Sequence, residues 1–181
     1  MKRSKRIIIC LAVFLALFAA REGVYLLYPA PYLEYVEKYA VEYELDPYFL
    51  LAVIKTESRF DREAQSHKGA MGLMQLTEST AYWIAETTSM KNFSTEDLYD
   101  PELNIWMGSW YLDNLSKEFS STELVLAAYN AGRGNVKKWT DSQLISADGT
   151  DFENIPYGET VNYIKKVRIN QKIYSILYRL D

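Results

Sequence analysis

The sequence of 181 residues contains one cysteine and one histidine, Cys10 and His67. A single cysteine excludes a framework of disulfides and any cysteine-based zinc site, and a single histidine excludes a metal site built from several imidazoles. Glycine and proline are also scarce, with 8 and 5 residues, which excludes collagen-like and linker-dominated chains. We therefore expect no metal site, and we interpret His67 as a surface loop residue.

The composition is otherwise that of a globular protein, with 49% apolar and 24% charged residues, so the chain can bury a core. The net charge of −4 is unevenly distributed. Residues 1–30 hold five basic residues and one acidic residue, a balance of +4, and the remaining 15 basic and 23 acidic residues give −8. Because nucleic-acid binding requires a basic surface, this acidic part is not expected to bind nucleic acid.

The N-terminus has the pattern of an export segment. Basic residues within positions 2–6 precede the apolar run Ile7–Ala20, as in the first two regions of a secretory signal. The residues near its end do not form a good small-residue cleavage pattern, and apolar character resumes at Val24–Tyr28. We expect residues 1–28 to be an uncleaved membrane anchor, with a cleaved signal as the alternative. In both cases the positive-inside rule places the rest of the chain outside the cytoplasm.

From residue 29 onward the apolar residues recur at helical spacing, and no sustained alternation indicates a strand. Asp-Pro pairs at residues 46–47 and 100–101 are typical helix starts, Thr122 is expected to cap another helix, and Gly132 is expected to end it. We therefore predict one compact all-α domain over residues 29–181. Its expected helices cover residues 32–43, 47–58, 78–86, 101–119, 122–131 and 157–180, with one or two further turns at 134–139.

Glu57 lies at the end of the apolar helix predicted over residues 47–58. Apolar surroundings disfavour the charged carboxylate, and the negative end of a helix acts in the same direction, so both raise the pKa of the carboxyl. A raised pKa suits a general acid that works near neutral pH. On this local evidence alone, a solvated helix-end glutamate remains the alternative.

Five segments in order resemble the catalytic domain of the soluble lytic transglycosylase family, whose fold is similar to goose-type lysozyme. They are ESRF from Glu57, GAMGLMQ from Gly69, DPELNIWMGSWYL from Asp100, AYNAG from Ala128 and IPYGETVNY from Ile155. The resemblance covers approximately residues 46–168. It implies a lysozyme-like helical domain that cleaves the β-1,4 bond between N-acetylmuramic acid and N-acetylglucosamine in peptidoglycan.

The resemblance further implies that Glu57 is both the acid and the base. It protonates the leaving oxygen and then accepts the proton of the muramoyl C6 hydroxyl, which attacks C1 and closes a 1,6-anhydro ring. Such a lyase needs no cofactor and no second catalytic carboxylate. Two alternatives stay open: a hydrolytic muramidase, for which Asp61 and Asp100 are available, and a catalytically silent scaffold that binds the cell wall.

The other positions that match the family are expected to bind substrate. The resemblance implies that Ser66 helps to hold the glutamate and the sugar, that the Tyr129 hydroxyl reaches the glutamate, and that Glu159 and Tyr163 line the floor of the groove. Core packing remains the alternative for Met74, and a buried structural pair for Glu159 and Tyr163. The full set is Ser66, Met74, Gln75, Tyr129, Asn130, Glu159 and Tyr163.

The expected partners are peptidoglycan glycan strands and, through the N-terminal segment, the membrane. The sequence does not indicate which component of the cell-wall machinery recruits the protein. Peptidoglycan is often anionic, so a domain at −8 gains no general electrostatic attraction to it. We therefore expect the groove to be less acidic than the other faces. Trp106 and Trp110 stand four residues apart, and we expect them to pack in the core.

Overall fold

The computed structural model describes residues 2–180 and divides into two compact units, one ending at Pro31 and the other beginning at Tyr32. The first unit contains α1 (Lys2–Leu27), which continues without a break past the ion pair of Arg21 with Glu22. Within α1, Ile9–Leu27 is long and apolar enough to cross a membrane by length and composition, and none of it is buried. Its 19 residues extend about 28 Å, close to the ~30 Å hydrocarbon core of a bilayer.

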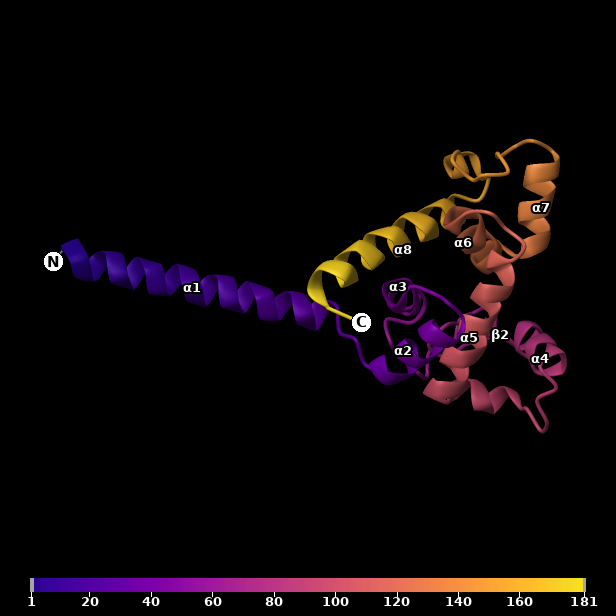
Figure 1. The fold of residues 1–181 in the computed structure, drawn as a ribbon, viewed down its shortest axis with the longest axis horizontal. Coiled ribbons are helices and arrows are strands. Elements are labelled where there is room, and N and C mark those ends of the chain that lie inside the picture. Colours follow the sequence, from indigo (N-terminus) through magenta and orange to yellow (C-terminus); the bar gives the residue numbers. More distant parts are fainter. Residues whose placement is uncertain (1, 181) are drawn as a thin grey trace. The chain divides into compact units, whose positions relative to one another are not determined.

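The second unit is almost entirely helical, which confirms the predicted fold class (Figure 1). The expected helices are present, most of them within one to three residues of the predicted ends. In order, the elements are α2 (Leu33–Glu42), α3 (Pro47–Glu57), β1 (Ala70–Met71), β2 (Leu76–Thr77), α4 (Glu78–Thr87), η1 (Thr95–Tyr99), α5 (Pro101–Ser116), α6 (Thr122–Ala131), α7 (Arg133–Asp141), η2 (Phe152–Asn154) and α8 (Gly158–Leu177).

The helix starts follow from side chains that accept hydrogen bonds from free backbone amides. Asp46 accepts from the amide of the second residue of α3 at 2.9 Å, and Asp100 does the same for the third residue of α5 at 2.9 Å. The cap of α6 is Ser121, which accepts from Leu124 N at 3.3 Å. The expected cap at Thr122 was therefore wrong by one residue, because adjacent hydroxyl residues fit the role equally well. Gly132, with φ 91°, ends α6 as predicted.

A short antiparallel pair of strands, β1 and β2, was not predicted. Strands of two residues are too short to show alternation, so the sequence carries no signal for them. Gly72 lies between them at φ +75°, and a Cβ there would be 2.2 Å from both Leu98 O and Asn104 Nδ2. Only glycine therefore allows the hairpin to approach the segment before α5 this closely.

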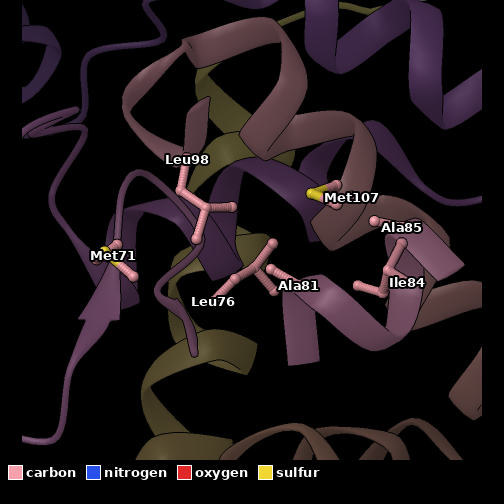
Figure 2. Packing of buried hydrophobic residues seen from close by; sticks show 7 residues of the cluster. All are labelled: Met71, Leu76, Ala81, Ile84, Ala85, Leu98 and Met107. Atoms are coloured by element: carbon pink, nitrogen blue, oxygen red, sulfur yellow. The ribbon is translucent and has the colours of Figure 1, made fainter. Parts of the chain in front are cut away.

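The hairpin is held by an apolar cluster that also includes α4 and α5. Figure 2 shows Met71 of β1 and Leu76 of β2 on the same side of the hairpin as the α4 side chains. Trp106 and Trp110 pack against this cluster, as expected. Its buried members are Met71, Leu76, Ala81, Ile84, Ala85, Leu98 and Met107. The cluster fixes the loop between the strands, which forms one wall of the groove described below.

The opposite wall depends on α3, whose residues 49–54 are all buried. Helix α3 packs against α8 (Figure 1), and Asn170 of α8 donates to Thr56 Oγ1 at 2.9 Å. Thr56 in turn donates to Ala52 O at 2.7 Å. These bonds hold the last turn of α3 against α8, so the position of Glu57 is set by two helices rather than by a free helix end.

Candidate active site

A groove of about 490 Å³ lies where α3, α6 and α8 meet the hairpin and the loop before it. Every sequence-predicted site residue except Met74 and Tyr163 lines it. The lining residues are Glu57, Ser66, His67, Lys68, Ala70, Gln75, Thr77, Tyr129, Asn130, Ala131, Tyr157, Glu159 and Thr160. Side chains separated by more than 100 positions in the sequence therefore share one surface.

Glu57 is half-buried and is the last residue of α3. The chain leaves the helix through Arg59 and Phe60, whose φ angles of 55° and 68° are left-handed. Ser58 Oγ accepts from Phe60 N at 3.1 Å and supports this turn. Left-handed backbone is unfavourable for residues with a Cβ, and such strain often accompanies functional sites. Here it ends the helix sharply and leaves the Glu57 carboxyl in the groove.

Burial raises the pKa of Glu57 to about 7, and interaction with the Tyr163 hydroxyl opposes this shift without cancelling it. The direction is that expected from the apolar helix that precedes Glu57. The loss of hydration outweighs the interaction with Tyr163, and no cation among the described residues contributes to the pKa of Glu57. A substantial fraction of Glu57 is thus protonated near neutral pH.

Two tyrosines enclose Glu57. The Tyr163 side chain is 6% exposed, and its buried hydroxyl faces the carboxyl without a complete hydrogen bond to any described residue. The Tyr129 hydroxyl donates instead to Met74 O at 2.7 Å, so it approaches Glu57 while engaged with the backbone. Burial, followed by the nearby Glu57 charge, holds both tyrosine pKa values well above their usual range. Both side chains are therefore neutral hydrogen-bonding groups.

Ser66 and Gln75 are fixed by the backbone of the loop. Ser66 Oγ accepts from Ala70 N at 3.0 Å, which leaves its hydroxyl proton for the groove. Gln75 adopts φ +50°, and its Nε2 donates to Ala64 O at 3.0 Å and to Gly72 O at 2.9 Å. The amide nitrogen is thus engaged, and the amide oxygen is the free acceptor of this side chain among the described contacts.

Asn130 follows Tyr129 on α6 and is oriented by α8. Its Oδ1 accepts from Thr160 Oγ1 at 2.8 Å, which leaves the amide NH₂ as a donor toward the groove. Thr160 itself is 2% exposed. The hydrogen bond from the buried Thr160 hydroxyl of α8 therefore fixes the orientation of the Asn130 side chain in the groove.

The structure places Met74 and Glu159 differently from the expectation. Met74 is fully buried, and its side chain packs against Gly108, where an added Cβ would lie 2.3 Å from the Met74 sulfur. It supports the groove through its backbone only. The Glu159 side chain is 78% exposed and lies 3.8 Å from Lys68 Nζ. Glu159 is therefore at the rim rather than on the floor, because it lies on the exposed side of the first turn of α8, whereas Thr160 of the same turn is buried.

Several lining residues were not recognised from the sequence. His67 is exposed as expected, yet it lies on the groove together with Lys68. Thr77 and Tyr157 also line it, as does Thr160. In the sequence, these residues could have been recognised only by their positions in or beside the family motifs. Their segments are far apart in the sequence and meet only in the folded chain. Among the residues that the structure describes, no group of three or more His, Cys, Asp or Glu is arranged to hold a metal ion.

A comparison with protein families matches residues 34–150 to the Transglycosylase SLT domain. The chain belongs to this family. The match begins in α2 and includes Glu57, the hairpin and α6. It confirms the family that the sequence motifs resemble.

Individual relatives of the SLT family agree with this assignment. The soluble lytic murein transglycosylase of Escherichia coli K12 is 33% identical over 143 residues, which are 77% of this chain and 22% of that protein. The membrane-bound lytic murein transglycosylase C of Photorhabdus laumondii is 32% identical over an alignment of 167 residues, and the match covers 79% of this chain and 46% of that protein. The chain thus spans less than half the length of either relative.

Solved structures of the SLT family match the second unit in three dimensions. Lytic transglycosylase Slt from Pseudomonas aeruginosa, solved as an inactive mutant, superposes with a TM-score of 0.75 at 32% identity over 82% of this chain and 24% of that one. A complex of the 70 kDa soluble lytic transglycosylase with bulgecin A gives 0.75 at 30% identity, over 82% and 25%. The helical unit therefore has the family's fold.

Proposed function

We propose that this protein is a peptidoglycan lytic transglycosylase that cleaves the β-1,4 bond between N-acetylmuramic acid and N-acetylglucosamine. The observation that carries the proposal is the half-buried Glu57 with a pKa of about 7. Among the described residues, the one other carboxylate that lines the groove is Glu159, which is 78% exposed. A hydrolase with two catalytic carboxylates needs both beside the scissile bond. A single buried carboxyl instead suits a reaction in which the substrate supplies its own nucleophile.

The proposed reaction uses Glu57 twice. In the first step its proton passes to the glycosidic oxygen while the bond from that oxygen to muramoyl C1 breaks. In the second step the C6 hydroxyl oxygen bonds to C1, and its proton passes to the Glu57 carboxylate. The carboxyl is thereby regenerated, no water is consumed, and the muramoyl end becomes a 1,6-anhydro ring.

The groups around Glu57 suit a carboxyl that loses its proton in the first step and regains it in the second. Tyr163 is a neutral donor that faces Glu57, and such a donor stabilises the carboxylate after the first proton transfer. The Tyr129 hydroxyl is engaged with Met74 O and lines the groove as a neutral group. Ser66, Gln75 and Asn130 offer a hydroxyl, an amide oxygen and an amide NH₂ to sugar hydroxyl and acetamido groups. We assign Met74 a supporting role, and we assign Glu159 to the rim of the substrate groove.

The charge of the groove is close to neutral, so the groove repels an anionic polymer less than a strongly acidic surface would. Apart from Glu57, whose pKa is raised by burial, the lining includes one basic and one acidic side chain, Lys68 and Glu159. These charges nearly balance, in a domain that carries −8 overall. The expectation that the groove is less acidic than the other faces is consistent with this lining.

We further propose that α1 tethers the helical unit to the outer face of the cell membrane. The apolar stretch Ile9–Leu27 has the required length, the basic residues precede it, and a relative is named as membrane-bound. A cleaved signal is the alternative. The intact mass of the protein recovered from the membrane fraction distinguishes the two, because signal cleavage removes α1.

The mass of the released sugar tests the reaction. Detergent-solubilised full-length protein is incubated with purified peptidoglycan, and the soluble muropeptides are analysed by mass spectrometry. We expect muramoyl ends that are lighter by one water than reducing ends. Reducing ends would replace the proposal with hydrolysis. Binding to peptidoglycan without release of any product would favour a silent scaffold.

The pH dependence tests the acid role of Glu57. With a pKa of about 7, the protonated form predominates below this value and is lost as the pH rises. We expect kcat/KM on soluble glycan strands to fall about tenfold per pH unit above roughly pH 7.5. The profile is measured from about pH 5 to about pH 9. A constant kcat/KM across the alkaline half of this range would contradict the assignment.

A further inference from the structure

A second depression adjoins the active-site groove. It has a volume of about 300 Å³ and is lined by Ser79, Thr80, Trp83, Tyr111 and Arg133. None of these residues belongs to the predicted site. The depression lies between the start of α4, the middle of α5 and the start of α7.

The depression and the groove share a wall. The ring of Tyr111 in the depression packs against the ring of Tyr129 in the groove, with centroids 5.4 Å apart. On the other side, Thr77 Oγ1 of the groove is 2.9 Å from Thr80 Oγ1 and 3.2 Å from Ser79 Oγ. A substrate held beside Glu57 can therefore extend a substituent over this wall without leaving the protein surface.

Among the described residues that line the depression, Arg133 is the one with a charged side chain, and this side chain is held in place. Its guanidinium lies over the Trp83 ring at 5.1 Å from the centroid. Nη2 donates to Asn114 Oδ1 at 2.5 Å and pairs with Glu118 Oε2 at 3.2 Å. The side chain is still 39% exposed. A guanidinium that is already held in place loses little entropy when it binds a carboxylate.

The hydrogen-bonding capacity of Arg133 is not used up in this structure. Both partners engage Nη2, and Nε is buried without a partner among the described residues. Glu118 also pairs with Lys137 Nζ at 2.7 Å, so one carboxylate faces two cations. The cluster of Arg133, Lys137 and Glu118 thus keeps one positive charge, whereas the domain as a whole is acidic.

The aromatic side chains favour an acidic ligand over a stacked sugar ring. Trp83 is surrounded by the Arg133 guanidinium, by Trp110 at 5.2 Å and by Tyr111 at 6.0 Å between centroids. The Arg133 guanidinium covers one face of this ring and competes there with a stacked sugar. The group that remains available is the guanidinium, whose planar fork matches a carboxylate.

We propose that this depression binds a carboxylate of the peptide stem carried by the muramoyl residue, with Arg133 as the binding residue. The proposal rests on the proposed function, because only a substrate seated in the groove presents its stem at this position. It assigns to the protein a preference for glycan strands that still bear acidic stems.

The test compares peptidoglycan strands with stems against the same strands after enzymatic removal of the stems. Arg133→Gln is expected to lower kcat/KM about tenfold on stem-bearing strands, mainly through KM, since a hydrogen bond to a charged group is lost. On stem-free strands we expect a change of less than about twofold. Lys138→Gln is the matched control, because Lys138 is an exposed cation on the same helix outside the depression.

Ser79→Asp provides a second test that does not depend on whether Arg133→Gln folds correctly. Ser79 is exposed in the first turn of α4, where an acidic residue is favourable. The new carboxylate adds negative charge to the wall of the depression, so we expect the same selective loss on stem-bearing strands. An equal loss on both substrates, or no loss in either variant, would overturn the proposal.

A binding measurement separates this proposal from the proposed function. A soluble stem peptide with a free glutamyl carboxylate, and its carboxamide analogue, are titrated into the full-length protein while tryptophan fluorescence is recorded. We expect the carboxylate form to bind at least about tenfold more tightly than the carboxamide, and Arg133→Gln to remove this difference. If the protein cleaves neither the stem-bearing nor the stem-free strands, the proposed function fails, but this titration still decides whether the depression binds a carboxylate. Equal affinity for the carboxylate and carboxamide peptides would overturn the proposed role of the depression.

Discussion

Replacing Glu57 with glutamine is expected to lower the rate of peptidoglycan cleavage at least about a thousandfold. Glutamine keeps the size and polarity of the side chain, so substrate still binds, but its amide cannot donate the proton that the leaving oxygen needs. The other carboxyl in the described lining of the groove, Glu159, is 78% exposed, so we expect no group to replace Glu57. The rate is measured as soluble muropeptide released per unit time.

The matched control for this variant is Glu63→Gln. Glu63 is an exposed carboxylate on the loop after α3, paired with Arg62 at 2.9 Å and absent from the groove lining. We expect its variant to cleave at the rate of the unaltered protein. Cleavage by Glu57→Gln at a comparable rate would show that Glu57 is not the acid.

Glu57→Gln is also expected to change the stability of the folded protein. The pKa of Glu57 is about 7 in the folded protein, against an ordinary value of 4.5, so between these values the folded state binds more protons than the unfolded state. Stability therefore falls as the pH rises through this window. Glutamine removes this cost, which is of the order of 3 kcal/mol above pH 7. Glu57→Gln should unfold at a higher temperature than the unaltered protein near pH 8, with little difference near pH 4.

Replacing Asn104 with alanine is expected to destabilise the protein by about 3 to 5 kcal/mol. Asn104 is fully buried. Its Nδ2 donates to Leu98 O at 2.8 Å and to Met71 O at 3.1 Å, and its Oδ1 accepts from Met74 N at 2.7 Å. Alanine leaves two carbonyls and one amide without partners where water has no access, and each unsatisfied group costs about 1 to 3 kcal/mol.

The loss extends to the active site because Asn104 holds the loop that carries Gln75. The Met74 carbonyl accepts the Tyr129 hydroxyl, so a shift of this loop displaces a side chain next to Glu57. We therefore expect a lower kcat even at temperatures where the variant is folded. Stability is measured by urea unfolding of the detergent-solubilised protein.

Asn154→Ala provides the control for this experiment. Asn154 is exposed, and its one described side-chain hydrogen bond is to Asp151 at 3.5 Å. The expected change is less than about 0.5 kcal/mol. A similarly small effect of Asn104→Ala would mean that the hairpin is held by its apolar contacts alone.

The helices were accessible from the sequence because their signals are local. An aspartate before a proline, a glycine after an apolar run and a 3.6-residue spacing act within one turn. The same locality explains the errors. Ser121 and Thr122 are both competent caps, and the two-residue strands contain no periodic pattern.

The candidate site was accessible only in part. Ordered motifs predicted the family, and the apolar helix before Glu57 predicted the direction in which its pKa is shifted. The burial of Met74 was not predictable, because it depends on contact with Gly108 on another helix. The position of Arg133 beside Trp83 likewise joins residues 50 positions apart in the sequence.

The sequence by itself determined the helices, the family and the scarcity of groups able to do chemistry: one histidine, one cysteine and a glutamate at the end of an apolar helix. Only the tertiary structure decided which of the groove's carboxyls is the more buried, which tyrosine faces it, and that Arg133 lines the adjoining depression. The physical reason is that burial and electrostatic environment are set by segments that meet across the fold. Neither burial nor electrostatic environment can be predicted from the spacing of neighbouring residues.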